Sequence, residues 1–437
     1  MNTLLKDARV MTADEAAKLV KSGDHVYVQG STSVPQTLLE AIARRHDELR
    51  DVTFYTGFSV SKGVAPICMA GMEDSFFVDA FFVSNNVRQW IADGHGATTP
   101  RFLGDVPALF RRGYWPLDVV LLNCSLPDSH GYVSFGVGGD VACSAVECGK
   151  TVIAQINPHM PFSNGDPVIH VSRLAAAVEV NDPLVEVPTP VPNEAEKRIG
   201  GYIAELIPDG ATLQIGVGGI PNAVIAALGN HKHLGLHTEA MTDGVLPLLE
   251  KGIIDNSQKK VLPGKSVASL ALGSRNLYDY MDHNPQIVFR DVAWTNNPSI
   301  IGANPKVMSI NSCLEIDLTG QICADSIGER IFSGVGGQHD FVTGANISDG
   351  GISFIAMLAT SSKGHNKIKP QLTPGAGVVT TRFAAEYVVT EYGAVNLRGK
   401  NLAQRAKLLS SIAAPQFREE LERAACERFG RAFMRLK

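Results

Sequence analysis

Residues 213–244, LQIGVGGIPNAVIAALGNHKHLGLHTEAMTDG, contain one strand–turn–helix–strand unit. The apolar run 213–215 is typical of a buried strand, and 216–221 follows it as a turn in which glycine permits positive φ. Residues 223–228 predict an apolar helix, because the proline just before them suits a first helical turn. The chain then returns as a second strand at 235–238. Such a unit is the repeating element of an α/β sheet.

Glu239 comes directly after the second strand, at the carboxyl end where open α/β sheets bind their ligands. A solvated glutamate beside a structural turn is one interpretation. A dinucleotide site is a second, because an acidic residue follows Gly218 by 21 positions, although Pro221 replaces the third glycine of that fingerprint. A nucleophilic glutamate beside backbone N–H groups is a third, and this unit alone leaves all three open.

Composition restricts the class of protein. The chain has 437 residues, which suggests two or three domains, and its 45% hydrophobic and 19% charged content is typical of a globular enzyme. A net charge of −5 without any block of Lys or Arg argues against a nucleic-acid partner. Apolar runs are short and interrupted by glycine, so no membrane span is expected. The N-terminus lacks an apolar leader, and we therefore expect a cytoplasmic location.

Cysteine and histidine patterns do not predict a metal or redox site. Seven cysteines occur without a CxxC pair, which favours reduced and mostly buried thiols. His231, His233 and His237 form an H-x-H-x3-H cluster, but no Cys or Asp completes a ligand set. We expect no metal.

The N-terminal half repeats the unit described above. A shift of 186 residues places Gly30 on Gly216 and Thr53 on Glu239, so the first copy keeps the turn but has no carboxylate at the strand end. A proline-rich segment, 181–193, has the composition of an extended linker between the two copies. Internal repetition of this kind indicates two α/β halves from one ancestor.

A second repeat extends this prediction, because GVGGD at 136–140 is similar to GVGGQ at 334–338. Each half alternates strands with helical patterns, which is typical of a mostly parallel sheet covered on both faces. We predict two tandem, duplicated open α/β domains, 1–185 and 186–437, with the active site in the second half facing the first.

The sequence also predicts a helix cap at Asp243 and a helical C-terminal tail. Asp243 is interpreted as the N-cap of a helix over 245–251. The tail from Asn401 predicts two helices, and the second, starting at Pro415, has an apolar face whose docking surface is either the other half or a partner subunit.

Four motifs, in order, resemble one family. They are GVGGIP at 216–221, HTEAMTDG at 237–244, FSGVGGQHDF at 332–341 and VTEYGAVNLRGK at 389–400. The chain resembles the acetyl-CoA hydrolase/transferase family, and within it the 4-hydroxybutyrate and butyrate:acetate CoA-transferases, over essentially its whole length. The resemblance implies CoA transfer between carboxylic acids through a glutamyl-CoA thioester.

The resemblance also implies roles for individual residues. Glu239 is the expected catalytic glutamate, and Asn296, Gly336 and Gly337 are the expected oxyanion donors. The residues expected to contact CoA are Gln214, Ile215, Gly216, Val217, Gly218, Gly219, Ser333, Gly336, Gly337 and Lys363. Turn capping by Asn296 and a solvated lysine loop around Lys363 remain structural alternatives.

The residue types suit this chemistry. A glutamate with an ordinary pKa near 4.3 is ionised at pH 7 and attacks a thioester without a general base. We therefore expect acyl-CoA and a short carboxylate as substrates, no permanently bound cofactor, and a homo-oligomer. An acyl-CoA hydrolase using the same site is the alternative, and a nicotinamide-dependent oxidoreductase is a more distant one. Candidate pocket residues are Met241, Gln338, His339 and Asp340.

Overall fold

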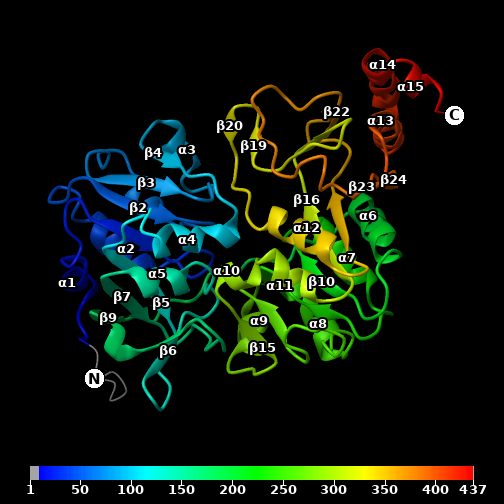
Figure 1. Ribbon diagram of the computed structural model, residues 1–437. Helices are drawn as coiled ribbons and strands as arrows, with labels where there is room; N and C mark the ends of the chain where they lie inside the picture. Colours follow the sequence, from blue (N-terminus) through cyan, green and yellow to red (C-terminus); the bar gives the residue numbers. More distant parts are fainter. Residues whose placement is uncertain (1–8, 437) are drawn as a thin grey trace. The chain divides into compact units, whose positions relative to one another are not determined.

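The computed structural model in Figure 1 describes residues 9–436 and divides them into two compact units. The first unit comprises residues 9–188, 240–243 and 267–295, and the second comprises 189–239, 244–266 and 296–436. Segments of the second half of the sequence thus belong to the first unit. The simpler division between residues 185 and 186 stays a prediction, and the linker segment 181–193 contains no helix or strand.

The start of the chain is described only from residue 9, so residues 1–8, on which the prediction of a missing leader partly depends, lie outside the described residues. Between residues 9 and 436, no helix is both long and apolar enough to cross a bilayer.

The first unit is built on a seven-stranded sheet in which every neighbouring pair is parallel. Its strands are β1 (His25–Val28), β2 (Val52–Thr56), β3 (Phe76–Ala80), β4 (Gly96–Thr98), β5 (Val119–Cys124), β7 (Thr151–Ile156) and β9 (Ala176–Glu179), in the order β4-β3-β2-β1-β5-β7-β9. The helices are α1 (Ala13–Ala17), α2 (Gln36–Ala43), α3 (Arg88–Ala92), α4 (Val106–Arg111) and α5 (Ala142–Cys148). Two further strands, β6 (Tyr132–Ser134) and β8 (Val168–His170), form an antiparallel pair.

Alternation along the strands buries both faces of this sheet. Val26, Val28 and Phe54 lie in one apolar core together with residues of α1 and α2. Tyr27 and Tyr55, their neighbours in sequence, lie in a second core with residues of α4 and α5. Because successive side chains of a strand point to opposite faces, both faces require helical cover, as expected for a parallel sheet (Figure 1).

Segments from later in the chain complete the first unit. They form β12 (Ala240–Thr242), β13 (Ser266–Ala268), β14 (Leu270–Leu272), α9 (Arg275–Met281), β15 (Ile287–Phe289) and α10 (Val292–Thr295), and β12 pairs in parallel with β14. The first-half glycine segment 136–140 binds this insertion, since Gly139 N donates to Ser269 O (3.2 Å) and Ala271 N donates to Val137 O (2.9 Å).

The second unit contains a six-stranded sheet in the order β11-β10-β16-β21-β23-β24. The strands are β10 (Thr212–Ile215), β11 (Gly235–Leu236), β16 (Val307–Ser312), β21 (Ile352–Ala356), β23 (Tyr387–Thr390) and β24 (Gly393–Asn396), and only β24 is antiparallel to its neighbour. Its helices are α6 (Glu194–Ala204), α7 (Gly219–Ala227), α8 (Leu246–Glu250), α11 (Pro298–Ala303), α12 (Gln338–Ile347), α13 (Leu402–Ser411), α14 (Arg418–Phe429) and α15 (Arg431–Met434). Shorter strands are β17 (Glu315–Asp317), β18 (Ile322–Cys323), β19 (Ser326–Ile327), β20 (Arg330–Ile331) and β22 (Ile368–Lys369).

The two sheets share one strand order, which supports the predicted duplication. The series β2-β1-β5-β7 in the first unit corresponds to β11-β10-β16-β21 in the second. The fold is therefore α/β with mostly parallel sheets, as predicted. In the second unit the chain runs from β10 outward to β11 and then returns to β16, so the strand order reverses beside the carboxyl end of β10. Reversals of this kind are where open α/β sheets bind ligands.

The C-terminal helices settle one open question. Leu421 and Ala425 of α14 are fully buried, and they share an apolar core with Ile316, Ile368 and Val388. The predicted apolar face therefore packs within the second unit itself.

The predicted N-cap role of Asp243 is wrong. Its carboxylate accepts from Ser274 N (2.9 Å to Oδ2) and from Ser274 Oγ (2.9 Å to Oδ1), whereas Val245 is the N-cap of α8. Asp243 thus binds the residue that precedes α9, within the first unit, because the chain turns through a short 3₁₀ segment before α8 begins.

A buried lysine in the second unit predicts a pH-dependent stability. Lys259 is 4% exposed, its Nζ donates to Leu236 O (2.9 Å) and to Lys265 O, and burial lowers its pKa to about 7. An unfolded lysine has a pKa near 10.4, so between about pH 7 and about pH 10 the unfolded chain binds the additional proton. The free energy of unfolding should therefore rise with pH across this window, by up to about 1.4 kcal/mol per pH unit, and be insensitive to this group below about pH 7.

Lys259→Met should remove that contribution, because methionine has no titrating group. Urea unfolding of both proteins from about pH 6 to about pH 10 measures the difference, with Lys260→Met at the exposed neighbour as control. Identical pH profiles for the parent and Lys259→Met would contradict the prediction.

Candidate functional site

Glu239 is held beside the first glycine turn by the residue before it. Thr238 Oγ1 accepts from Ile215 N (3.3 Å) and donates to Ile215 O (3.2 Å), and both residues are buried. Ile215 ends β10 and is followed directly by the turn at Gly216. This pair of hydrogen bonds therefore brings the start of the turn and the half-buried Glu239 together at the carboxyl ends of β10 and β11.

An amide group contacts the Glu239 carboxylate. Asn296 Nδ2 donates to Glu239 Oε2 (2.7 Å) and also lies 3.4 Å from Oδ2 of the buried Asp340. Because both neighbours are carboxylate oxygens, which only accept, the side chain must present its amino group to them. Asn296 is 1% exposed, so this orientation is fixed by its surroundings.

In the segment TNNP (295–298), Asn297, not Asn296, caps the helix α11. Asn297 Oδ1 accepts from Ser299 N (2.9 Å) and is the N-cap of α11. The side chain of Asn296 is therefore available to Glu239, and the capping alternative raised for Asn296 applies to Asn297.

Gly337 packs directly against this pair. A Cβ built on Gly337 would collide with both Glu239 Oε2 and Asn296 Nδ2, so no other residue fits here without displacing them. Gly337 is the N-cap of α12, and Gly336 before it has a φ of 57°, in the left-handed region that favours glycine. The backbone N–H groups and positive end of a ten-residue helix thus lie beside the carboxylate.

The first glycine turn also opens a helix. Gly218, with a φ of 135°, is the N-cap of α7, which begins at Gly219, and Val217 between the turn glycines is 50% exposed. The side chain of Gln214 lies in the sheet, where its Oε1 accepts from Ser309 Oγ (2.8 Å) and Asn311 Nδ2 (3.0 Å).

Ser333 and Lys363 lie on two other segments of the second unit. Ser333 N donates to Asp325 O (3.0 Å), which places Ser333 at the start of the turn that leads to Gly337. Lys363 is exposed near the tip of a short loop closed by Ser361 N, which donates to His365 O (2.8 Å). The structure thus brings Glu239, Asn296 and Gly337 into contact, while Lys363 stands on a separate loop.

The histidines of the H-x-H-x3-H cluster contact separate partners, and Cys124 and Cys313 are buried. His231 Nε2 contacts Ile207 O (3.0 Å), His233 Nδ1 contacts Asp255 Oδ2 (2.7 Å), and His237 Nδ1 contacts Asn304 Nδ2 (3.3 Å). These side chains point to three separate partners. Burial raises the pKa of the Cys124 and Cys313 thiols, which makes them poor nucleophiles.

Sequence reasoning missed the hydrogen bonds of Thr238 and offered Asp340 only as a pocket residue. Asp340 lies in the first turn of α12, where its carboxylate is close to the Asn296 amide. A threonine at a strand end has no distinguishing pattern, whereas the QHD sequence after the glycines at least indicated polar groups near the turn. Met241, another candidate pocket residue, is fully buried in β12.

Comparisons with known proteins identify the family to which this chain belongs. Residues 6–190 match the acetyl-CoA hydrolase/transferase N-terminal domain, and residues 273–425 match the acetyl-CoA hydrolase/transferase C-terminal domain. The chain belongs to the acetyl-CoA hydrolase/transferase family.

Individual relatives in this family are similar over nearly the whole chain. Succinyl-CoA:acetate/propanoyl-CoA:succinate CoA transferase of Fasciola hepatica is 43% identical over 95% of this chain and 87% of its own length. The 4-hydroxybutyrate coenzyme A transferase of Clostridium kluyveri is 41% identical over 96% of this chain and 98% of its own. The crystal structure of a 4-hydroxybutyrate CoA-transferase from Porphyromonas gingivalis has 40% identity and a TM-score of 0.83, covering 96% of this chain and 98% of that one.

Thr238→Val should destabilise the second unit, although the valine side chain has nearly the same volume as the threonine side chain. Valine cannot replace either hydrogen bond to Ile215, and leaving buried backbone groups of Ile215 unpaired costs about 1–3 kcal/mol. Urea unfolding measures this loss. Thr238→Ser keeps the hydroxyl group and serves as the control, so an equal loss in both variants would contradict the assigned hydrogen bonds.

Proposed function

We propose that this protein transfers CoA between an acyl-CoA and a small carboxylic acid, with Glu239 as the nucleophile. The observation that carries the proposal is the half-buried Glu239 carboxylate in contact with the Asn296 amide and with Gly337 at the start of α12. Membership of the family and the names of the relatives support CoA transfer as the reaction. Acids such as acetate, butyrate or 4-hydroxybutyrate are the proposed exchange partners.

The first half-reaction begins with attack of the Glu239 carboxylate on the thioester carbonyl. An oxygen–carbon bond forms, the carbon–sulfur bond breaks, and an acyl-glutamyl anhydride and CoA thiolate result. The thiolate then attacks the glutamyl carbonyl of the anhydride and expels the acid as its carboxylate, which leaves a glutamyl-CoA thioester. An incoming carboxylate repeats both steps in reverse, so ping-pong kinetics are expected.

Each step passes through a tetrahedral oxyanion, for which Asn296 and Gly337 are the proposed donors. Asn296 presents an N–H group towards Glu239. Gly337, the N-cap of α12, has no Cβ to obstruct access to its backbone N–H group. Donors fixed in advance cost little reorganisation when charge develops, which is why they are effective in acyl transfer.

CoA itself is bound as a substrate in this proposal, with no permanently bound cofactor. The glycine turns 214–219 and 333–337 and the Lys363 loop are the proposed contacts. The first turn opens α7, where a helix N-terminus and bare backbone N–H groups suit an anionic or carbonyl-bearing ligand. Binding energy from the remote nucleotide then seats the thioester against Glu239.

Two alternatives make different predictions. A hydrolase would use the same glutamate and release the thioester to water, so its turnover would not need a carboxylate acceptor. A nicotinamide-dependent enzyme would use the acidic residue for a ribose hydroxyl. The contact of Glu239 with Asn296 and Gly337 favours acyl chemistry over that role.

Mass spectrometry of the intact protein tests the proposal. Incubation with an acyl-CoA alone should add the mass of CoA, less one water, to the wild-type chain, on the peptide that contains Glu239. Glu239→Gln should not form the adduct, because an amide is a poor nucleophile. An adduct elsewhere, full activity of Glu239→Gln, or equally fast thioester loss without an acceptor would reject transfer through Glu239.

Asn296→Ala should lower kcat for exchange by about two to three powers of ten, because one oxyanion donor is lost. Asn297→Ala is the matched control, since this neighbour caps α11 and should cost about 1 kcal/mol of stability with little change in kcat. Steady-state kinetics and urea unfolding of both variants check the two effects, and equal kcat values would contradict the role of Asn296.

A further inference from the structure

Asp340 lies beside the proposed catalytic residues, on the helix that Gly337 begins. It is the third residue of α12, and it is buried. Its Oδ2 lies 3.4 Å from Asn296 Nδ2, the amide nitrogen that donates to Glu239 Oε2 (2.7 Å). One side-chain amide is thus shared by two carboxylates.

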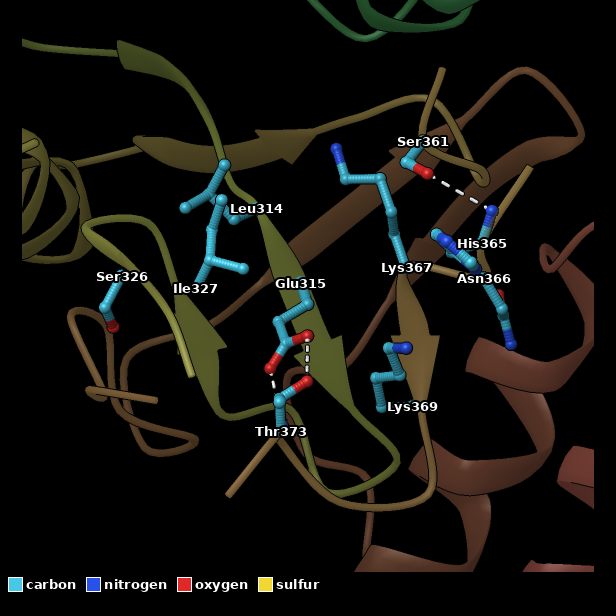
Figure 2. A pocket seen from close by; sticks show the side chains of 10 residues that line it. All are labelled: Leu314, Glu315, Ser326, Ile327, Ser361, His365, Asn366, Lys367, Lys369 and Thr373. Carbon is cyan, nitrogen blue, oxygen red and sulfur yellow. Dashed lines mark hydrogen bonds between the residues drawn. The ribbon is translucent and has the colours of Figure 1, made fainter. Parts of the chain in front are cut away.

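Two other carboxylates of the second unit each have donors of their own. Glu315 accepts from Thr373 N (2.6 Å) and Thr373 Oγ1 (2.8 Å), as the dashed lines in Figure 2 show. Asp317 accepts from Thr319 N (2.8 Å) and Thr319 Oγ1 (2.6 Å). These hydrogen bonds hold backbone segments in place. The contact of Asp340 differs from them, because its donor is the amide that also contacts the proposed nucleophile.

The packing of two helices holds Asn296 next to Asp340. Asn296 directly precedes the segment that begins α11, and Asp340 lies in the first turn of α12. These helices approach closely, since a Cβ built on Gly344 of α12 would lie 2.5 Å from Cγ2 of Ile301 in α11. The amide therefore stays near the Asp340 carboxylate independently of the strand end that carries Glu239.

The two carboxylates differ in what happens to them during the proposed reaction. Glu239 loses its negative charge when it becomes an anhydride or a thioester, and hydrogen bonds to charged acceptors are about twice as strong as those to neutral ones. Asp340 takes no part in the covalent steps and keeps both acceptor oxygens. An acceptor beside Asn296 holds the N–H groups of the amide, and not its carbonyl oxygen, in place for the next oxyanion.

We propose that Asp340 is a positioning residue, which holds the Asn296 amide in its donor orientation while Glu239 is covalently modified. The inference rests on the proposed CoA transfer through Glu239. It concerns chiefly the second half-reaction, in which the incoming carboxylate attacks the glutamyl-CoA carbonyl, an acyl-glutamyl anhydride forms, and CoA leaves as the thiolate.

Decay of the glutamyl-CoA adduct tests the proposal, because this step starts with Glu239 already modified. The adduct is formed with an acyl-CoA, desalted, mixed with acetate and followed by mass spectrometry at successive times. Asp340→Ala should slow the decay at least about tenfold, because the oxyanion donor is no longer held in place. Asp340→Asn still offers a carbonyl oxygen to the amide, so it should recover most of this loss.

A double-mutant cycle separates positioning from a structural role. In the Asn296→Ala background, Asp340→Ala should change the decay rate by less than about twofold, because the amide that it holds is already absent. Asp317→Ala is the matched control, since it removes another buried carboxylate of the same unit. It should lower the urea midpoint without changing the decay rate of the adduct.

Unchanged decay in Asp340→Ala, or a loss that adds in full to that of Asn296→Ala, would overturn the proposal. NMR of protein with isotope-labelled asparagine reads the amide without turnover. The side-chain N–H signals of Asn296, assigned with Asn296→Ala, should shift in Asp340→Ala and not in Asp317→Ala. That shift without any adduct in the parent protein would support the contact and refute transfer through Glu239. An adduct with unchanged signals in Asp340→Ala would refute the positioning role alone.

Discussion

The hydrogen bond from Asn296 Nδ2 to Glu239 Oε2, with Gly337 packed against both side chains, is the contact on which the candidate site depends. Its partners are 57 residues apart in sequence, and a third segment supplies the glycine. Glu239 follows β11, Asn296 lies just before α11, and Gly337 lies just before α12, so three separate segments of the second unit meet at this contact. A side chain at 337 would separate the amide from the carboxylate, so the contact depends on the missing Cβ as much as on the two polar groups.

Local signals in the sequence predicted local structure well. Thr12 and Glu15, only three positions apart, form a capping box at the start of α1, which is the kind of feature that a short sequence pattern encodes. The unit at 213–238 also folds as predicted, although α7 begins at Gly219, four residues before the expected start. A helix that starts on its own glycine turn buries apolar residues such as Ile220 early, and this burial outweighs the poor helix propensity of glycine.

Features that depend on distant segments were not predictable from the residues alone. Ala240–Thr242 is too short to have a recognisable period, and its pairing with Leu270–Leu272 is set by register, which no local pattern encodes. Asp243 likewise finds its donor 31 residues away at Ser274. For Asn296 and Asn297 the residue types are identical, and only the position at which α11 begins decides which one caps the helix and which one contacts Glu239.

The glycine segment of the first half, 136–140, has different contacts from its counterpart in the second half, 334–338. Its backbone groups at Val137 and Gly139 are already paired with Ala271 and Ser269. The alignment of Thr53 with Glu239 by a shift of 186 residues is wrong, because Thr53 lies within β2 opposite His25, whereas Glu239 follows the end of β11. The first glycine segment thus pairs its backbone with residues 269–271, whereas the second lies beside the half-buried carboxylate of Glu239. With Glu239 as the proposed nucleophile, each polypeptide contributes one reactive group, so that titrating active sites counts protein molecules one for one.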